Sequence, residues 1–146
     1  MKNKTILLVE DNPDDQELIQ MALDESHIAN ELVIVSDGAQ ALDYLLGSGK
    51  SEVRDLVPLP QVILLDLKLP KVSGLEVLRR LRSEPRTALV PVVILTTSSE
   101  QEDMLSSYAL HANSYIRKPV DFGQFAEAVK QLGLYWLVLN EAPPMK

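Results

Sequence analysis

The chain contains no cysteine among its 146 residues. Disulfide bonds, thiolate metal sites and a cysteine nucleophile are therefore excluded together. Long apolar runs are also missing, and the longest, residues 134–139, falls far short of the roughly 18 residues that a membrane-spanning helix needs. No signal peptide is expected, because only four aliphatic residues follow the charged start before acidic residues appear. We therefore expect a cytoplasmic protein without a membrane partner.

Positive charge is scarce. The chain has 14 Lys and Arg against 21 Asp and Glu, which gives a formal net charge of −7. Binding to the phosphate backbone of DNA or RNA depends on a basic surface, so no nucleic-acid partner is expected. The length and the 46% hydrophobic content suit one globular domain.

The apolar runs that are present are short, and four of them lead directly into polar residues suited to phosphoryl chemistry. These are residues 6–9 before Glu10 and Asp11, 62–65 before Asp66, 92–95 before Thr96, and 115–117 before Lys118. Runs of aliphatic residues bounded by turn residues are typical of buried strands in a parallel sheet. Ligand sites in such sheets form at the carboxyl ends of the strands, so we expect these polar side chains to share one site.

Segments with helical periodicity lie between these runs. Asn12 before Pro13 is typical of a helix start. The expected elements are strands at 6–9, 32–35, 62–65, 92–95 and 115–117, and helices at 13–27, 39–46, from 74, at 100–110 and from 121. This alternation predicts an α/β fold, a (βα)₅ doubly wound parallel sheet of five strands.

The three acidic residues at two of the strand ends point to a metal site. Glu10, Asp11 and Asp66 would repel one another strongly unless a cation lay among them, and oxygen ligands favour a hard ion such as Mg²⁺. A partly buried carboxylate beside a cation stays ionised and can attack phosphorus. We therefore expect Asp66, which ends the most hydrophobic strand, to form an aspartyl phosphate.

The other two strand ends supply a hydroxyl group and an amine. Thr96 and Lys118 can both reach the equatorial oxygens of a phosphoryl group, where charge develops during transfer. Lys118 precedes Pro119, and a cis bond there would turn the ammonium group back across the edge of the sheet. Most bonds before proline are trans, so the sequence leaves the isomer open.

These residues, together with 67–70 and Gly74, resemble the receiver domain of two-component response regulators over residues 4–132. The resemblance implies a CheY-like, flavodoxin-like fold with strand order 2-1-3-4-5 and a receiver domain over residues 1–132. It further implies that Asp66 accepts a phosphoryl group from a sensor histidine kinase. A downstream effector or phosphotransfer protein would then respond, and the chain would not be a conventional enzyme.

The same resemblance assigns roles within the site. It implies that Asp11, Asp66 and the backbone carbonyl of Lys68 hold Mg²⁺, with an indirect part for Glu10. Thr96 and Lys118 would bind the phosphoryl oxygens. Tyr115 would be the aromatic switch residue that turns inward with Thr96, although an ordinary strand aromatic is the alternative.

The connection 47–60 and the apolar tail, residues 134–144, restrict the resemblance to one subfamily of receivers. Together they are similar to the single-domain regulators associated with phytochromes, which implies a bacteriophytochrome kinase and an extended last helix that contributes to a homodimer. Residues 133–146 would be the dimerisation element. Its expected interface residues are Leu134, Tyr135, Trp136, Leu137 and Leu139, because an exposed apolar surface with aromatic anchors usually marks an interface. The alternative is that the tail folds back onto its own domain.

Two other functions compete with the phosphorylated switch. A receiver used as a phosphorylation-independent scaffold would be expected to lack part of the acidic pocket, and here every part is present. An aspartate-nucleophile phosphatase usually carries a second acid two residues after the nucleophile, whereas this chain has Lys68 there. The sequence therefore favours the switch over both.

Overall fold

The computed structural model describes residues 4–28, 30–47, 59–119 and 121–144. Within these residues, five parallel strands form one sheet in the order β2-β1-β3-β4-β5. The strands are β1 (Lys4–Val9), β2 (Asn30–Val35), β3 (Val62–Leu65), β4 (Val92–Thr96) and β5 (Ser114–Arg117). The helices are α1 (Pro13–Glu25), α2 (Gly38–Leu46), α4 (Gly74–Ser83), α5 (Gln101–Ala109) and α6 (Phe122–Leu134), followed by η1 (Tyr135–Leu139). The doubly wound fold and strand order predicted from the sequence are confirmed.

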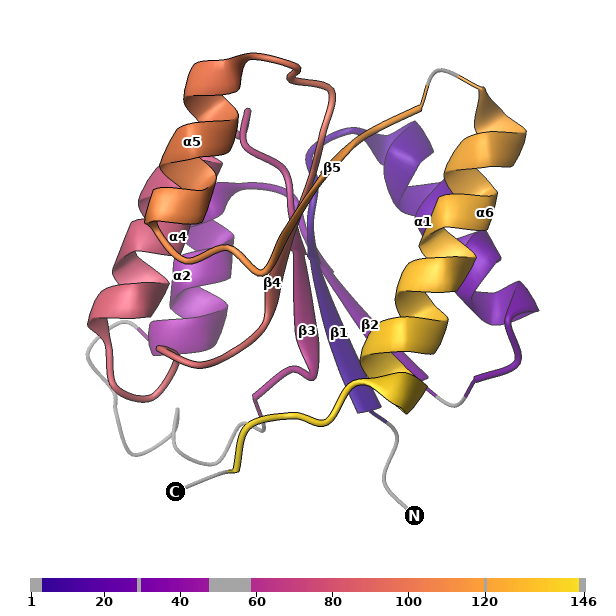
Figure 1. Ribbon diagram of the computed structural model, residues 1–146, viewed down its shortest axis with the longest axis horizontal. Coiled ribbons are helices and arrows are strands. Elements are labelled where there is room, and N and C mark those ends of the chain that lie inside the picture. Colours follow the sequence, from indigo (N-terminus) through magenta and orange to yellow (C-terminus); the bar gives the residue numbers. More distant parts are fainter. Residues whose placement is uncertain (1–3, 29, 48–58, 120, 145–146) are drawn as a thin grey trace.

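Helices cover both faces of the sheet (Figure 1). α1 and α6 pack on one face, and α2, α4 and α5 pack on the other. The strands supply both cores because successive side chains of a strand point to opposite faces. In β1, Leu7 and Val9 enter the core beneath α2 and α4, while Ile6 and Leu8 enter the core beneath α1 and α6. Burial on both faces explains why the central strands are almost wholly apolar.

Most predicted boundaries lie within a few residues of those observed. β2 begins at Asn30 rather than at residue 32, because it pairs with β1 from Lys4 onward. The predicted cap of α1 is confirmed, since Asn12 Oδ1 accepts hydrogen bonds from the backbone N–H groups of Asp14 and Asp15 at 2.9 and 3.2 Å. Residues 48–58, which make up most of the long connection 47–60, lie outside the described residues.

The tail extends the last helix, but it is not exposed all round. α6 continues into the π-helical turn η1, which ends with an Asn140 N–H to Tyr135 carbonyl bond of 2.6 Å. Trp136 and Leu137 are buried in the core beneath α1 and α6, and Lys4 Nζ donates to the Leu137 carbonyl. The folded-back alternative therefore holds for these two side chains. No helix in the described part of the chain is long and apolar enough to cross a membrane.

Candidate functional site at the carboxyl edge of the sheet

The predicted site residues gather where the sheet reverses its strand order. β1 and β3 are neighbours, and Asp66 N–H donates to the Val9 carbonyl at 3.1 Å, so the ends of these strands lie level with each other. One carboxylate oxygen each of Glu10, Asp11 and Asp66 lies within 4.8 Å of the others. Glu10 and Asp66 are buried, whereas Asp11 is exposed. The cluster therefore opens to solvent on the side of Asp11.

Lys118 reaches this cluster from the end of β5. Its Nζ lies 3.2 Å from Asp66 Oδ2 and also forms an ion pair with Glu10 Oε1. No cis peptide bond occurs among the residues that the structure describes, so the bond between Lys118 and Pro119 is trans. The ammonium group thus reaches the acidic residues without the cis isomer that we considered from the sequence.

Burial and neighbouring charges shift the pKa values of Glu10 and Lys118. Burial raises the pKa of Glu10 to about 7, although the hydrogen bond from Lys118 lowers it. Burial acts in the opposite direction on Lys118, but hydrogen bonds to Asp15 and Glu10 and the charge of Asp66 raise its pKa above the usual value. Lys118 is therefore a fixed positive charge at physiological pH, and a second cation beside Glu10 would lower the pKa of that carboxyl group.

The donor set suits a hard divalent cation. The three carboxylates of the cluster are matched by one ammonium group, which contacts Glu10 and Asp66, so the cluster carries excess negative charge when all are ionised. Asp11 and Asp66 offer carboxylate oxygens, the ligand type that Mg²⁺ and Mn²⁺ prefer. The backbone of Lys68 is also fixed beside the cluster, because its N–H donates to Asp66 Oδ1 at 3.3 Å. These residues can therefore hold one such ion.

Thr96 and Tyr115 lie on the side of the site formed by β4 and β5. Thr96 is fully buried, and its Oγ1 accepts a hydrogen bond from the Ser98 N–H at 3.4 Å. The hydroxyl group of Tyr115 donates to the Ser98 carbonyl at 3.0 Å. Ser98 Oγ in turn donates to Asp103 Oδ2 at 2.6 Å, at the start of α5. One loop residue thus contacts the predicted phosphate-binding threonine, the predicted aromatic switch and a helix.

Asp15 is a member of the site that the sequence analysis did not identify. Its Oδ2 lies 2.8 Å from Lys118 Nζ, so a fourth carboxylate touches the cluster. In the sequence, Asp15 is an acidic residue two positions after Pro13, near the predicted helix start. One feature of the sequence could have indicated this role: Asp15 lies in the first turn of a helix that begins directly after β1. A side chain in that turn can point back over the ends of the strands.

Gly74 allows α4 to approach the backbone of Asp66. A Cβ atom at Gly74 would lie 2.1 Å from the Asp66 carbonyl oxygen and 2.6 Å from Leu67 Cα. Both are backbone atoms, which cannot move aside as the end of a side chain can. The glycine therefore fixes the distance between the helix start and the acidic cluster.

We expect Gly74→Ala to lower the free energy of unfolding by about 2 kcal/mol, as forced overpacking does. If Asp66 accepts a phosphoryl group as we expect, the variant should also be phosphorylated more slowly, because the added Cβ displaces the backbone of Asp66. Urea denaturation measures the first effect. Gly123→Ala is a matched control, because its Cβ would meet only the end of the Asp121 side chain, at 3.1 Å. Equal losses of stability in the two variants would contradict the close-approach argument.

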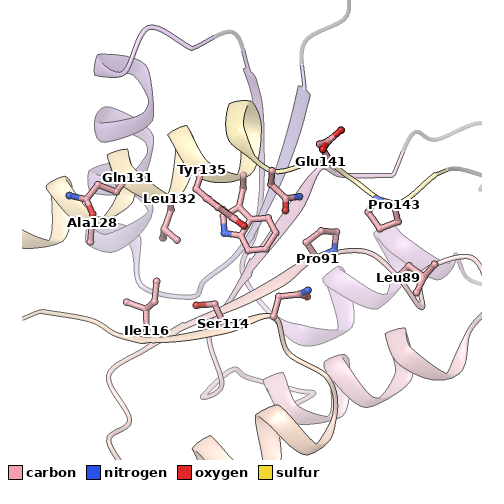
Figure 2. Close-up of a pocket in the computed structure, with 13 residues that line it drawn as sticks. Leu89, Pro91, Ser114, Ile116, Ala128, Gln131, Leu132, Tyr135, Glu141 and Pro143 are labelled. Carbon is pink, nitrogen blue, oxygen red and sulfur yellow. The ribbon is translucent and has the colours of Figure 1, made fainter.

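A groove of about 670 Å³ lies at the opposite end of the sheet from the acidic cluster. Figure 2 shows it between the start of β5 on one side and the end of α6 with the tail on the other, with Ser114, Leu132, Tyr135 and Pro143 on its walls. Pro91 and Asn113, which precede β4 and β5, place it at the amino ends of these strands. It is therefore separate from the phosphoryl chemistry that we expect at the carboxyl ends.

Known proteins that resemble this chain do so over almost its whole length. Residues 6–130 match the response regulator receiver domain family. The chain is 41% identical to response regulator Rcp1 of Synechocystis sp. over 134 residues, which are 92% of this chain and 89% of that protein. It is 40% identical to the probable methanogenesis regulatory protein FilR2 of Methanothrix harundinacea over 141 residues, which are 94% of this chain and 86% of that protein.

Solved structures agree with the sequence relatives. The phosphorylated cyanobacterial phytochrome response regulator RcpA is similar with a TM-score of 0.90 and 41% identity, over 98% of this chain and all of that one (100%). The Mn²⁺-bound form of Rcp1 is similar with a TM-score of 0.88 and 40% identity, over 97% of this chain and 99% of that one. The likeness therefore includes the tail as well as the sheet.

Proposed function

The chain belongs to the response regulator receiver family, and from that premise we propose that Asp66 accepts a phosphoryl group from a sensor histidine kinase. The observation that carries the proposal is the 3.2 Å contact of Lys118 Nζ with Asp66 inside a cluster of carboxylates. An oxygen of Asp66 attacks phosphorus, the bond between phosphorus and the kinase histidine breaks, and the leaving imidazole takes up a proton. The protein is then a phosphoacceptor that promotes its own phosphorylation and autodephosphorylation, not a conventional enzyme.

The proposed cofactor is Mg²⁺, held by Asp11, Asp66 and the backbone carbonyl of Lys68, with Glu10 acting indirectly. The relative Rcp1 has been solved with Mn²⁺, an ion of the same charge and similar ligand preference. When bound, the cation neutralises charge that develops on the phosphoryl oxygens. Lys118 would contribute a second positive charge, because its Nζ already lies 3.2 Å from Asp66 Oδ2.

Phosphorylation would change the loop between β4 and α5. The phosphoryl oxygens would accept charge-assisted hydrogen bonds from the ammonium group of Lys118, which is already beside Asp66, and from the hydroxyl group of Thr96, which they would draw toward Asp66. Because Ser98 N–H already bonds Thr96 Oγ1 and its carbonyl bonds Tyr115, the loop and the aromatic ring would move with the threonine. The new charge would therefore shift the population toward a second arrangement of the surface built from α5, β5 and α6, which a downstream effector or phosphotransfer protein would contact.

The proposed kinase is a bacteriophytochrome. RcpA is a phytochrome response regulator and is 41% identical to this chain, which supports a light-sensing kinase. FilR2, a probable methanogenesis regulatory protein, is 40% identical to this chain. Sequence identity of this level is therefore shared with a regulator whose name refers to a process other than light sensing. The test is the rate of phosphoryl transfer to this chain from a purified phytochrome kinase, compared with the rate from an unrelated histidine kinase. Faster transfer from the phytochrome kinase would support the light-sensing partner.

We also propose that the tail forms a homodimer with a second copy of this chain. Leu134, Tyr135 and Leu139 are all at least 47% exposed, and they lie in or next to η1. Tyr135 also lines the groove at the amino ends of β4 and β5, and so does Leu89, which is 66% exposed. A second copy that covers these side chains would remove their apolar surface from water.

The proposed function predicts a defined mass change. Incubation with acetyl phosphate and Mg²⁺ should add one phosphoryl group to the chain, and omission of Mg²⁺ should reduce the fraction modified by at least about tenfold, because the cation carries part of the charge stabilisation. Intact-mass spectrometry measures both. A chain that binds Mg²⁺ but gains no mass, even within seconds, would instead be a scaffold with the receiver fold.

A further inference from the structure

The ammonium group of Lys118 contacts three carboxylates from three separate segments. Glu10 follows β1 and Asp66 follows β3, while Asp15 lies in the first turn of α1, with Asp15 Oδ2 2.8 Å from Nζ. An ammonium group has three N–H donors, so each donor has an acceptor. We propose that Asp15 is a positioning residue for phosphoryl transfer, which holds Lys118 Nζ in place for the phosphoryl group that arrives on Asp66. This inference rests on the proposed function of Asp66.

Asp15 is well suited to hold another side chain. Its backbone N–H donates to Asn12 Oδ1 at 3.2 Å, and Pro13 restricts the backbone of the same turn. Its side chain is 19% exposed, more than the 2% of Glu10 and the 9% of Asp66. Asp15 is therefore the most exposed of the three carboxylates that contact Lys118, and its bond opposes an outward turn of the ammonium group.

The arrangement also survives phosphorylation. When Asp66 becomes an acyl phosphate, a phosphoryl oxygen can replace Asp66 Oδ2 as the acceptor of one Lys118 donor. The bonds to Glu10 and Asp15 need not break, so the charge that stabilises the transition state is already in position. Asp15 would then affect the rate of the chemical step by acting through Lys118.

A general charge effect would give a different result. Asp15 adds negative charge near an anionic phosphodonor, so its removal could only strengthen donor binding. Loss of positioning instead lowers the rate at saturating donor. The two explanations separate when the half-saturating donor concentration and the maximal rate are measured independently.

The kinetic test uses acetyl phosphate at saturating Mg²⁺, with phosphorylated protein measured by intact mass over time. We expect Asp15→Ala to lower the maximal rate about tenfold, the scale of one lost charge-assisted hydrogen bond, without raising the half-saturating concentration. Asp15→Asn keeps an acceptor oxygen and should lose less. Asp14→Ala is the matched control, an exposed acid in the same turn, and should stay within about twofold of wild type.

A second measurement reads the position of Lys118 without phosphorylation. A protected side-chain ammonium signal in ¹H–¹⁵N NMR spectra, assigned to Lys118 by its loss in Lys118→Ala, should broaden or vanish through solvent exchange in Asp15→Ala. It should persist in Asp14→Ala. An unchanged ammonium signal in Asp15→Ala, an unchanged maximal rate, or an effect on half-saturation alone would overturn the inference. If the wild-type chain gains no phosphoryl group, the proposed function itself fails, even where the NMR result holds.

Discussion

Asp66→Asn should gain no phosphoryl group under conditions in which the wild-type chain gains one. An amide is not a nucleophile toward phosphorus, so the loss should be complete. Asn nevertheless keeps the size of Asp and an oxygen that can accept from the Lys68 N–H, which lies 3.3 Å from Asp66 Oδ1 in the native site. The fold should therefore be retained, and intact-mass spectrometry after incubation with acetyl phosphate and Mg²⁺ measures the effect.

Asp37→Asn provides the control for this variant. Asp37 is also a buried carboxylate, but it caps α2 by accepting a hydrogen bond from the Gln40 N–H at 2.7 Å. An Asn cap is about as good as an Asp cap, so this variant should be phosphorylated normally. Phosphorylation of Asp66→Asn would mean that another carboxylate is the acceptor, and peptide mapping would identify it.

Lys118→Ala separates phosphorylation from the response to it. This variant loses the ammonium group that contacts Asp66, and with it the proposed link between the phosphoryl group and the end of β5. We expect slower modification and a response to phosphorylation that is largely abolished. Amide-exchange protection of α5, compared before and after phosphorylation, measures that response.

The Trp136→Glu variant should have a much lower free energy of unfolding than the wild-type protein. Trp136 is only 8% exposed, packs in the core beneath α1 and α6, and meets the Tyr135 ring edge-on at a centroid distance of 5.0 Å. Loss of a buried aromatic side chain typically costs about 3–5 kcal/mol, and burial of a carboxylate in its place adds to that. We expect the free energy of unfolding, measured by urea denaturation, to fall by about 4 kcal/mol or more.

Leu139→Glu is the matched variant on the exposed side of the same turn. Leu139 is 62% exposed, so the change should alter stability of the monomer by less than about 0.5 kcal/mol. If the tail forms the proposed homodimer, the same change should shift the chain to a monomer in size-exclusion chromatography with light scattering. A dimer that persists in Leu139→Glu would remove this face of the tail from the proposed interface.

The comparison of these two residues corrects our expectation for Trp136. The apolar run 134–139 predicted an anchor for a second copy, but the structure turns Trp136 and Leu137 into the chain's own core and leaves Leu134, Tyr135 and Leu139 outside. Almost every position in this run is apolar, so the pattern contains no polar face from which an inward direction could be inferred. The π-helical turn changes the direction of each side chain further.

Asp15 illustrates a second kind of limit. Its place in the first turn of a helix is a local property, because Asn12 and Pro13 mark the start of that helix. Its contact with Lys118 joins residues 103 positions apart, and it depends on how α1 leaves β1 relative to the end of β5. Periodicity and spacing carry no information about that angle.

The sequence by itself determined the α/β architecture, the strand order implied by the receiver resemblance, and the gathering of Glu10, Asp11, Asp66 and Lys118. The physical reason is that the architecture and the gathering of these side chains follow from local patterns: strands buried on both faces are recognisably apolar, and parallel strands bring their carboxyl ends to one edge. The strand order rested on the resemblance. Only the tertiary structure decided which tail residues are covered, that Tyr115 and Thr96 meet at Ser98, and that Asp15 reaches Lys118. Each of these depends on packing between elements distant in the chain, where several arrangements satisfy the same local pattern and long-range contacts select one.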